Sequence, residues 1–207
     1  MIIEAKHNFF IYPFFKLYAL FKVRRNFREV IIVGHLEEKN LPVLLVSNHL
    51  SWWDGFWAMY LNLKLIRRKF HFMMLEEQLR LYSFFINTGG YSVRKGSRSV
   101  IESINYTKRL LADRKNMVLL FPQGKITSLY DQTLKFEKGL EHILKDLKGK
   151  VQVVFMANLV DYLSNEKPTL YMYIQEYSIS DTGTAKPEDD YNRFYSQCIA
   201  ENIKRTD

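Results

Sequence analysis

A histidine and an aspartate five residues apart are the residues of this chain best suited to act together in catalysis. Residues 47–55 read Ser-Asn-His-Leu-Ser-Trp-Trp-Asp-Gly and contain His49 and Asp54. Within a regular helix, residues i and i+5 lie roughly 140° apart around the axis, so the pair would not share a face. We therefore expect His49 to lie in a loop just before a helix, with its ring turned back toward Asp54. A carboxylate placed there orients an imidazole that removes a proton from a hydroxyl group.

The pair by itself also fits a simpler interpretation. A histidine and an aspartate at this spacing occur by chance, and Asp54 then only caps a helix beside a loop histidine. The flanking segments support the loop position, because an apolar run over 41–46 predicts a buried strand and residues 56–65 predict an apolar helix. Other parts of the chain must therefore decide whether the pair is catalytic.

Strands alternate with helices along the chain, which predicts a single α/β domain with a mixed, mostly parallel sheet flanked by helices. The two runs 30–36 and 41–46 are expected to form a hairpin or neighbouring strands. The remaining predicted strands cover 70–75, 91–94, 117–121, 151–157 and 170–175. The predicted helices cover 52–65, 77–86, 98–114 with Ser97 as its N-cap, 139–147 and the tail 191–204.

Three polar residues follow or end predicted strands of this sheet. His49 follows one strand, Arg94 ends another and Gln123 follows a third. Ligand and active-site groups of α/β sheets gather at the carboxyl ends of strands. The sequence therefore predicts that these residues meet at one edge of the sheet.

Four motifs in order carry a resemblance to a known family. They are Asn48-His49-x4-Asp54, Gly89-Gly90-Tyr91-Ser92-Val93-Arg94, Phe121-Pro122-Gln123-Gly124 and Phe136-Glu137-Lys138-Gly139. From about Val30 to Ala157 the chain resembles the glycerolipid acyltransferases, a family that includes the 1-acylglycerol-3-phosphate acyltransferases of bacterial membranes. The resemblance implies transfer of a fatty acyl group from an acyl thioester to the hydroxyl of a lysolipid.

The resemblance also implies roles for individual residues. His49 is then the general base and Asp54 its orienting carboxylate, while backbone N–H groups near Trp52 and Trp53 stabilise the oxyanion. Substrate-binding residues carried over from the motifs are Arg94, Gln123, Gly124, Lys125 and Lys138. We expect no metal and no cofactor besides the donor substrate, which is acyl-ACP (the thioester of acyl carrier protein) or acyl-CoA.

The third motif departs from the family pattern. The family has Phe-Pro-Glu-Gly, then Ser or Thr, then Arg, whereas this chain has Phe121-Pro122-Gln123-Gly124-Lys125-Ile126-Thr127. Ile126 cannot grip a phosphate as an arginine does, and lysine does not reproduce the planar two-point contact. The acceptor is therefore 1-acylglycerol-3-phosphate or a lysolipid with another headgroup, such as an amino acid or a sugar. A catalytically inactive lipid-binding relative is a further alternative.

Composition favours anionic partners. The chain has 207 residues, a formal net charge of +8 and one cysteine, Cys198, which excludes an internal disulfide. Membrane lipids, an acyl carrier protein and nucleic acid all fit this charge. Because no nucleic-acid-binding motif is present, we expect membrane lipids and an acyl carrier protein or coenzyme A thioester as partners, and no nucleic acid.

Aromatic and basic residues fill the N-terminal segment. Residues 6–28 contain six Lys or Arg and no acid, and Pro13 and Lys16 interrupt the apolar run. The run is shorter than the roughly 20 residues that cross a bilayer. We predict an amphipathic interfacial segment over 1–28, an acyltransferase domain over 29–207, and a peripheral or monotopic protein at the cytoplasmic face of the membrane. The alternative is a helix packed on the domain's own core.

Overall fold

The computed structural model describes residues 2–96, 99–178 and 186–206. The helices are α1 (Ile11–Asn26), α2 (Asp54–Leu61), α3 (Glu76–Leu81), α4 (Ser99–Leu110), α5 (Gly139–Leu147) and α6 (Pro187–Asn202), with a π turn η1 (Asn62–Ile66) and a 3-10 turn η2 (Ser83–Asn87). The strands are β1 (Glu29–Val33), β2 (Val43–Ser47), β3 (Lys69–Leu75), β4 (Gly90–Val93), β5 (Asn116–Leu120), β6 (Gln152–Asp161) and β7 (Thr169–Tyr177). The predicted cap Ser97 lies outside the described residues.

The strands form one sheet in the order β1-β7-β6-β2-β5-β3-β4. Neighbouring strands are parallel except β6 and β7, so the predicted α/β fold with a mixed, mostly parallel sheet is confirmed. The expectation that the first two strands neighbour each other is wrong, because β7 and β6 lie between them. Every residue of β2 is buried in the sheet centre, whereas β1 is partly exposed at an edge.

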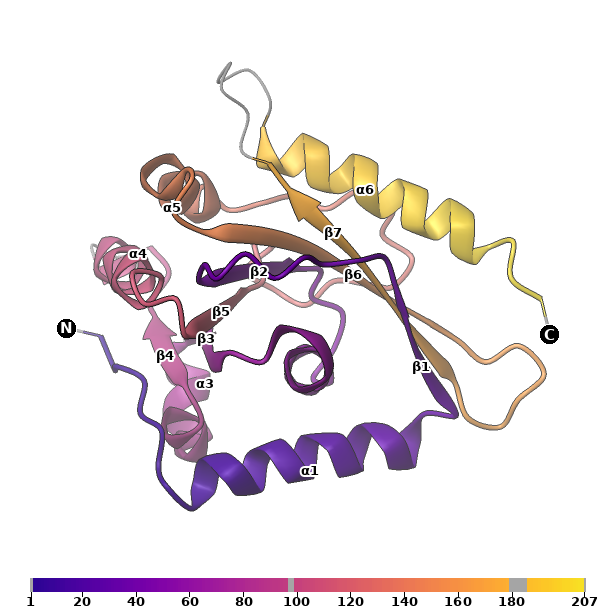
Figure 1. Ribbon diagram of the computed structural model, residues 1–207, viewed down its shortest axis with the longest axis horizontal. Coiled ribbons are helices and arrows are strands. Elements are labelled where there is room, and N and C mark those ends of the chain that lie inside the picture. Colours follow the sequence, from indigo (N-terminus) through magenta and orange to yellow (C-terminus); the bar gives the residue numbers. More distant parts are fainter. Residues whose placement is uncertain (1, 97–98, 179–185, 207) are drawn as a thin grey trace.

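Helices cover both faces of the sheet (Figure 1). Alternate residues of β2 point to opposite faces, as the pleat requires. Leu44 and Val46 belong to the core beneath α4, α5 and α6, and Val43 and Leu45 to the core beneath α1 and α2. The central strands are therefore buried on both sides, as is typical of parallel sheets.

Two predicted helices are shorter in the structure than their apolar patterns suggested. The helix expected over 52–65 begins at Asp54 and continues past Leu61 as the π turn η1. The helix expected over 77–86 is divided at Tyr82, where the backbone leaves the helical region between α3 and η2. Packing against neighbouring elements overrides local periodicity at both places.

Helix α1 is apolar on two faces, so the predicted amphipathic pattern is not observed. Its inner face is buried and packs near α2, whereas its outer face is exposed. The inner residues are Tyr12, Phe15, Ala19 and Val23, and the exposed residues include Phe14, Leu17 and Phe21. Within the described ranges, none of the helices has the length and apolar character that crossing a bilayer requires.

Candidate active site

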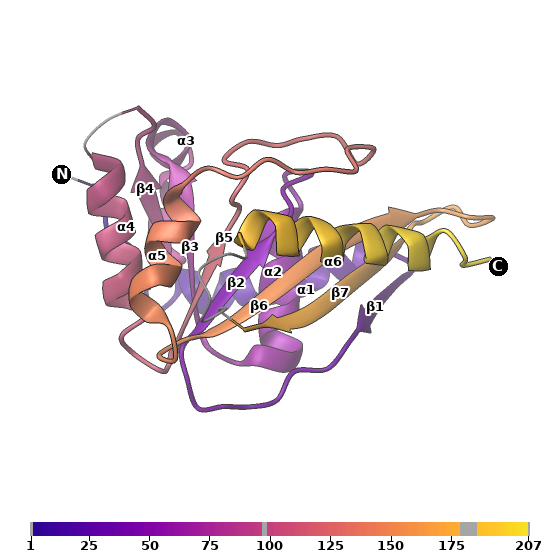
Figure 2. The same ribbon diagram turned by 90° about the horizontal axis from the view of Figure 1, so that it is seen from above.

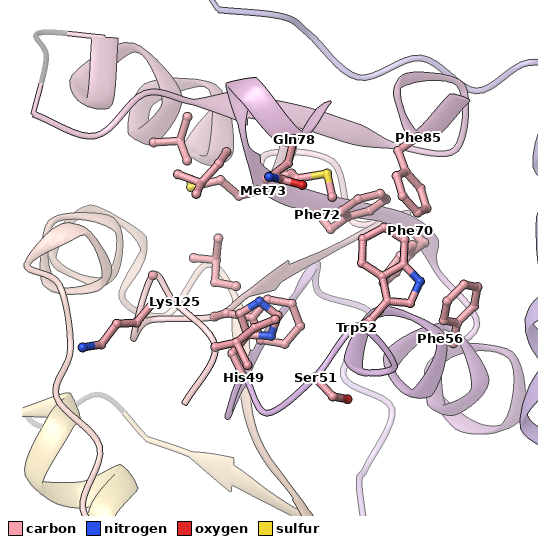
Figure 3. A pocket seen from close by; sticks show the side chains of 18 of the residues that line it. His49, Ser51, Trp52, Phe56, Phe70, Phe72, Met73, Gln78, Phe85 and Lys125 are labelled. Atoms are coloured by element: carbon pink, nitrogen blue, oxygen red, sulfur yellow. The ribbon is translucent and has the colours of Figure 1, made fainter. Parts of the chain in front are cut away.

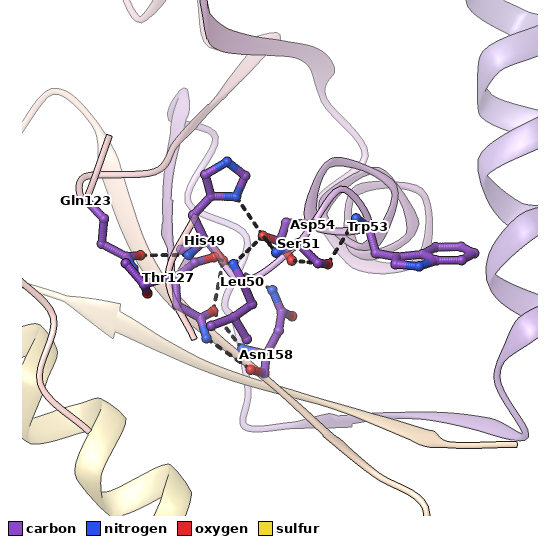
Figure 4. A network of polar contacts seen from close by, with 10 residues as sticks. His49, Leu50, Ser51, Trp53, Asp54, Gln123, Thr127 and Asn158 are labelled. Atoms are coloured by element: carbon purple, nitrogen blue, oxygen red, sulfur yellow. Dashed lines mark hydrogen bonds and ion pairs between the residues drawn. The ribbon is translucent and has the colours of Figure 1, made fainter. Parts of the chain in front are cut away.

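The predicted pair meets in the way that the sequence required. His49 lies two residues beyond the end of β2, and Asp54 is the first residue of α2. The His49 ring turns back over the helix start, and its Nδ1 lies 2.7 Å from Asp54 Oδ2 (Figure 4). Asp54 is fully buried. An imidazole held this way has a fixed orientation, and its Nε2 points away from the carboxylate.

The Asp54 carboxylate also shapes the loop that carries His49. Its Oδ2 accepts the N–H groups of Leu50 at 2.6 Å and Ser51 at 2.9 Å, and its Oδ1 accepts the Ser51 hydroxyl at 3.3 Å. A carboxylate in the first turn of a helix interacts favourably with the helix dipole. Asp54 therefore stabilises the loop before α2 and orients His49 at once, which combines the two interpretations that the sequence left open.

The third motif holds His49 from the other side. The His49 N–H donates to Gln123 Oε1 at 2.7 Å, and the Thr127 N–H donates to the His49 carbonyl at 2.9 Å. The Phe121 ring stacks on the imidazole with the ring centroids 4.1 Å apart and an interplanar angle of 10°. Because β5 lies next to β2, its C-terminal loop reaches this position at one end of the sheet (Figure 2). Residues 121–127 therefore fix both the backbone and the ring of His49.

Gln123 differs from its predicted role as a substrate ligand. Its side chain is almost completely buried, and its Nε2 donates to Thr127 Oγ1 at 2.7 Å while its Oε1 accepts from His49. Both ends of the amide are thus used inside the protein. The geometry corrects the expectation: Gln123 positions His49 and the loop behind it.

Two further hydrogen bonds connect the loop that carries His49 to β6. The Asn48 side chain donates to the Asn158 carbonyl at 3.0 Å and accepts the Asn158 N–H at 2.9 Å. Both residues are completely buried. This two-point contact continues the pairing of β2 with β6 beyond the end of the strand, so the residue before His49 is fixed to the neighbouring strand.

His49 forms part of the wall of a cavity of about 620 Å³ (Figure 3). Its side chain is 24% exposed, and Nε2 has no hydrogen-bond partner among the described residues. Most of the wall is apolar. The apolar lining residues are Phe15, Trp52, Phe56, Phe70, Phe72, Met73, Met74, Leu75, Phe85, Val93, Leu120, Phe121 and Ile126. An apolar cavity with a histidine on its wall suits a long alkyl chain whose reactive end lies at the histidine.

The cationic lining of this cavity differs from the predicted set. Lys125 and Gly124 line it as predicted, together with Lys95, which the sequence analysis missed. Gly124 has a φ of 62°, and a Cβ built there would lie 2.9 Å from Lys95 Nζ. A side chain at position 124 would therefore displace the lysine as well as strain the backbone. Lys95 also contacts Glu137 Oε1 at 3.3 Å.

Arg94 is not among the lining residues, although its neighbours Val93 and Lys95 are. Its guanidinium donates to Glu76 Oε1 at 2.7 Å, and Arg80 contacts the same oxygen at 2.9 Å. These two arginines, Arg94 first, lower the pKa of the Glu76 carboxyl. The predicted role of Arg94 as a substrate ligand stays a prediction, and in this structure its guanidinium is paired with Glu76. Lys95 lies in the turn after β4, so the alternation of side chains along a strand could not have indicated it.

Lys138 lies away from the cavity, and only one of the two predicted oxyanion donors has a free N–H among the described residues. Lys138 is exposed at the start of α5 and does not line the cavity. The Trp53 N–H donates to Ser51 Oγ at 3.0 Å, so it is already used. The Trp52 N–H has no acceptor among the described residues and remains the candidate donor of the two. Across the ranges that the structure describes, no cluster of three His, Cys, Asp or Glu side chains is suited to a metal ion.

Comparisons with known proteins show the family and agree with the fold. A family model described as Acyltransferase matches residues 21–158. The crystal structure of the 1-acyl-sn-glycerophosphate (LPA) acyltransferase PlsC from Thermotoga maritima is similar with a TM-score of 0.61 and 14% sequence identity. The match covers 94% of this chain and 80% of that one, and at this identity it supports the fold. A search of the curated proteins found no match.

Proposed function

The chain belongs to the acyltransferase family, and from this premise we propose that it transfers a fatty acyl group from a thioester to the hydroxyl of a lysolipid. The observation that carries the proposal is the position of His49. Its Nδ1 is bound by Asp54, and its ring lies on the wall of a large apolar cavity. A base oriented by a buried carboxylate beside an acyl-sized cavity is what such a transfer needs.

In the proposed reaction, His49 Nε2 takes the proton from the acceptor hydroxyl as its oxygen attacks the thioester carbonyl. The carbonyl oxygen becomes an oxyanion, for which the Trp52 N–H is the candidate donor. When the tetrahedral intermediate collapses, the carbon–sulfur bond breaks, and the thiolate receives the proton from the His49 imidazolium. The products are an acylated lipid and a free thiol, and Asp54 stabilises the imidazolium throughout.

The direct test measures release of thiol from an acyl-CoA and from an acyl carrier protein thioester, each with lysophosphatidic acid as acceptor. We expect turnover that depends on both substrates, with the acylated lipid identified by mass spectrometry. Thioester consumption without a lysolipid acceptor would indicate a hydrolase. No consumption with either donor, both with lysophosphatidic acid and with a lysolipid that lacks the phosphate monoester, would favour the inactive lipid-binding alternative. Comparing the two donors also decides between coenzyme A and acyl carrier protein.

We propose Lys95 and Lys125 as the groups that hold an anionic acceptor headgroup. Both line the His49 cavity, whereas Arg94 is bound to Glu76. Charge-assisted hydrogen bonds contribute roughly 1.5–3 kcal/mol each, which corresponds to about a 10- to 150-fold change in affinity. Replacing either lysine with Gln should therefore raise the KM for lysophosphatidic acid by about that factor. Lys138→Gln is the matched control, because Lys138 is exposed and does not line the cavity.

A second candidate acceptor is a lysolipid without a phosphate monoester. The observation that favours it is Ile126, which lines the cavity where the family pattern has an arginine. Gln123→Glu combined with Ile126→Arg restores the family pattern. If the native acceptor lacks the phosphate, this double variant should gain kcat/KM for lysophosphatidic acid and lose it for the native acceptor. High wild-type activity with no gain would exclude this candidate.

We propose that the exposed face of α1 binds the membrane surface, with the protein peripheral or monotopic at the cytoplasmic face. Phe14, Leu17 and Phe21 are exposed on this face, whereas Tyr18 packs against Phe56. Replacing the three exposed residues with Ser should release the protein from neutral phosphatidylcholine vesicles in a sedimentation assay. Unchanged sedimentation would mean that α1 serves only to pack on the core.

A further inference from the structure

A second cleft lies between α1 and the turn that follows α2. Its volume is about 400 Å³. The lining residues are Tyr12, Lys16, Asn62, Leu63, Arg67, Arg68 and Lys69. Four of these seven side chains are cationic, and none of the described residues that line the cleft is acidic. Such a lining favours an anionic ligand.

The cationic turn is held rigidly by one buried side chain. Asn62 Nδ2 donates to the Arg68 carbonyl at 2.8 Å, and the Arg68 N–H donates back to Asn62 Oδ1 at 2.9 Å. The Arg67 N–H donates to the Asn62 carbonyl at 2.7 Å, and Arg67 itself has a left-handed backbone with φ 59°. A non-glycine residue in this conformation is unusual and is maintained by its surroundings. The backbone that carries three consecutive cationic residues, Arg67 to Lys69, is therefore held by these bonds.

The wall of the cleft that α1 forms, opposite the cationic turn, is also held by contacts. The Tyr12 hydroxyl accepts the Phe70 N–H at 2.9 Å, which ties α1 to the start of β3. Lys16, one turn later, lies with its Nζ 4.4 Å from the centroid of the Tyr12 ring. Lys16 of α1 thus lines the same cleft as the cations of the turn. A ligand that carries negative charge would be attracted by all four cations.

Little on the protein neutralises this charge. Arg68 pairs with Glu38 at the edge of the cleft, but its buried Nε has no hydrogen-bond partner among the described residues. The two histidines nearby add no positive charge at neutral pH. Burial lowers the pKa of His7 and of His71 to about 4, and the positive charge of Lys69 acts in the same direction on both.

The cleft is separate from the His49 cavity. Phe15 lines that cavity, whereas Lys16 lines the cleft, and successive helical residues lie about 100° apart around the axis. The cleft and the cavity therefore open on different sides of α1. Helix α1 lies on the outside of the molecule (Figure 1), and Phe14, Leu17 and Phe21 are among its exposed residues.

We propose that this cleft binds the phosphate group of an anionic phospholipid at the membrane surface, as a lipid site distinct from the acceptor site. A lipid whose acyl chains contact the exposed face of α1 would bring its phosphate to the level of Lys16 and the Arg67–Lys69 turn, because the cleft lies beside that helix. The inference rests on the proposed membrane association. It adds a preference for anionic lipid and a defined orientation of α1 on the bilayer.

The test compares two double variants that remove the same charge. Arg67→Gln with Lys69→Gln removes two cations of the cleft, and Lys150→Gln with Lys204→Gln removes two exposed cations elsewhere. Sedimentation is measured with phosphatidylcholine vesicles and with vesicles that contain phosphatidylglycerol. Basic residues near an anionic surface contribute about 1 kcal/mol each, so the cleft variant should bind the anionic vesicles roughly 30-fold more weakly. Its binding to neutral vesicles and its turnover with a short-chain soluble acceptor should be unchanged.

Other outcomes would overturn the proposal in distinguishable ways. Equal weakening by the two double variants would mean that only net charge matters. Release by inorganic phosphate beyond that by chloride at the same ionic strength would identify free phosphate as the ligand. Intact vesicle binding with weakened binding to an acidic acyl carrier protein would identify a protein-docking site. If the wild-type protein does not bind neutral vesicles, or binds them equally well without Phe14, Leu17 and Phe21, the proposed membrane association itself is contradicted.

Discussion

Two histidine environments in this molecule differ in their partners, and only one of the two is suited to catalysis. His49 has a buried carboxylate on Nδ1 and lies on the wall of a cavity. His7 and His71 contact each other with ring centroids 4.7 Å apart, and their nearby charges are the cations Lys16 and Lys69. His7 Nε2 donates to the Phe70 carbonyl at 2.8 Å. Burial therefore keeps that pair neutral and structural.

The difference shows what makes a histidine a base in this fold. A carboxylate on one ring nitrogen stabilises the charge that a proton brings to the other, and an open cavity lets a substrate reach it. His71 is more deeply buried than His49 but lacks both conditions. A buried imidazole by itself therefore does not indicate function. Its hydrogen-bond partners and its access to a cavity decide whether it can act as a base.

The largest effect is expected from His49→Ala. Loss of a general base costs on the order of 10²- to 10⁴-fold in rate, so acyl transfer should fall by that factor. The contacts of His49 with Gln123 and Thr127 use its backbone, so the loop and the melting temperature should change little. Turnover is measured with a lysolipid acceptor. Near-normal turnover would contradict the assignment of His49 as the base.

Asp54→Asn should lower kcat by a smaller factor than His49→Ala. An amide cannot stabilise the imidazolium as a carboxylate does. The amide oxygen would also be a weaker acceptor for the Leu50 and Ser51 N–H groups, so the melting temperature should fall as well. Rate and melting temperature are therefore measured together. A lower melting temperature with an unchanged rate would make Asp54 a purely structural residue.

Gln123→Ala tests whether Gln123 positions His49 or binds the substrate. Loss of the hydrogen bond to the His49 N–H should lower kcat roughly tenfold, as expected for about 1.4 kcal/mol, with little change in KM. Gln123→Glu keeps an oxygen acceptor and should restore most of the rate. A raised KM with unchanged kcat would instead support the substrate-ligand role that the sequence suggested.

The smallest effect concerns His7, which titrates without taking part in catalysis. The pKa of His7 is lowered to about 4 in the folded protein, whereas an unfolded histidine titrates near 6.5. Between these values the unfolded chain binds more protons, so the free energy of unfolding should fall as pH falls from about 6.5 to 4. His7→Gln keeps a donor for the Phe70 carbonyl and should reduce that slope. An identical pH dependence in both proteins would exclude His7 as a cause.

The geometry of the His49–Asp54 pair could be predicted from the sequence. The spacing of His49 and Asp54 excluded a shared helical face and required the loop geometry that the structure has. The order of strands and helices likewise predicted the α/β fold, and the positions of His49 and Gln123 after two strands predicted that they meet. These inferences succeeded because they depend on local geometry and on the rule that parallel strands end at one edge of a sheet.

Tertiary structure alone decided the rest. Whether Arg94 or Lys95 faces the cavity depends on how the turn after β4 packs, because both residues lie beyond the end of that strand. The separation of β1 from β2 depends on long-range pairing with β7 and β6. The cleft at Lys16 exists because Tyr12 bonds to β3 and Asn62 folds the following turn. Contacts between residues far apart in sequence leave no periodic signal, and so only the folded chain shows them.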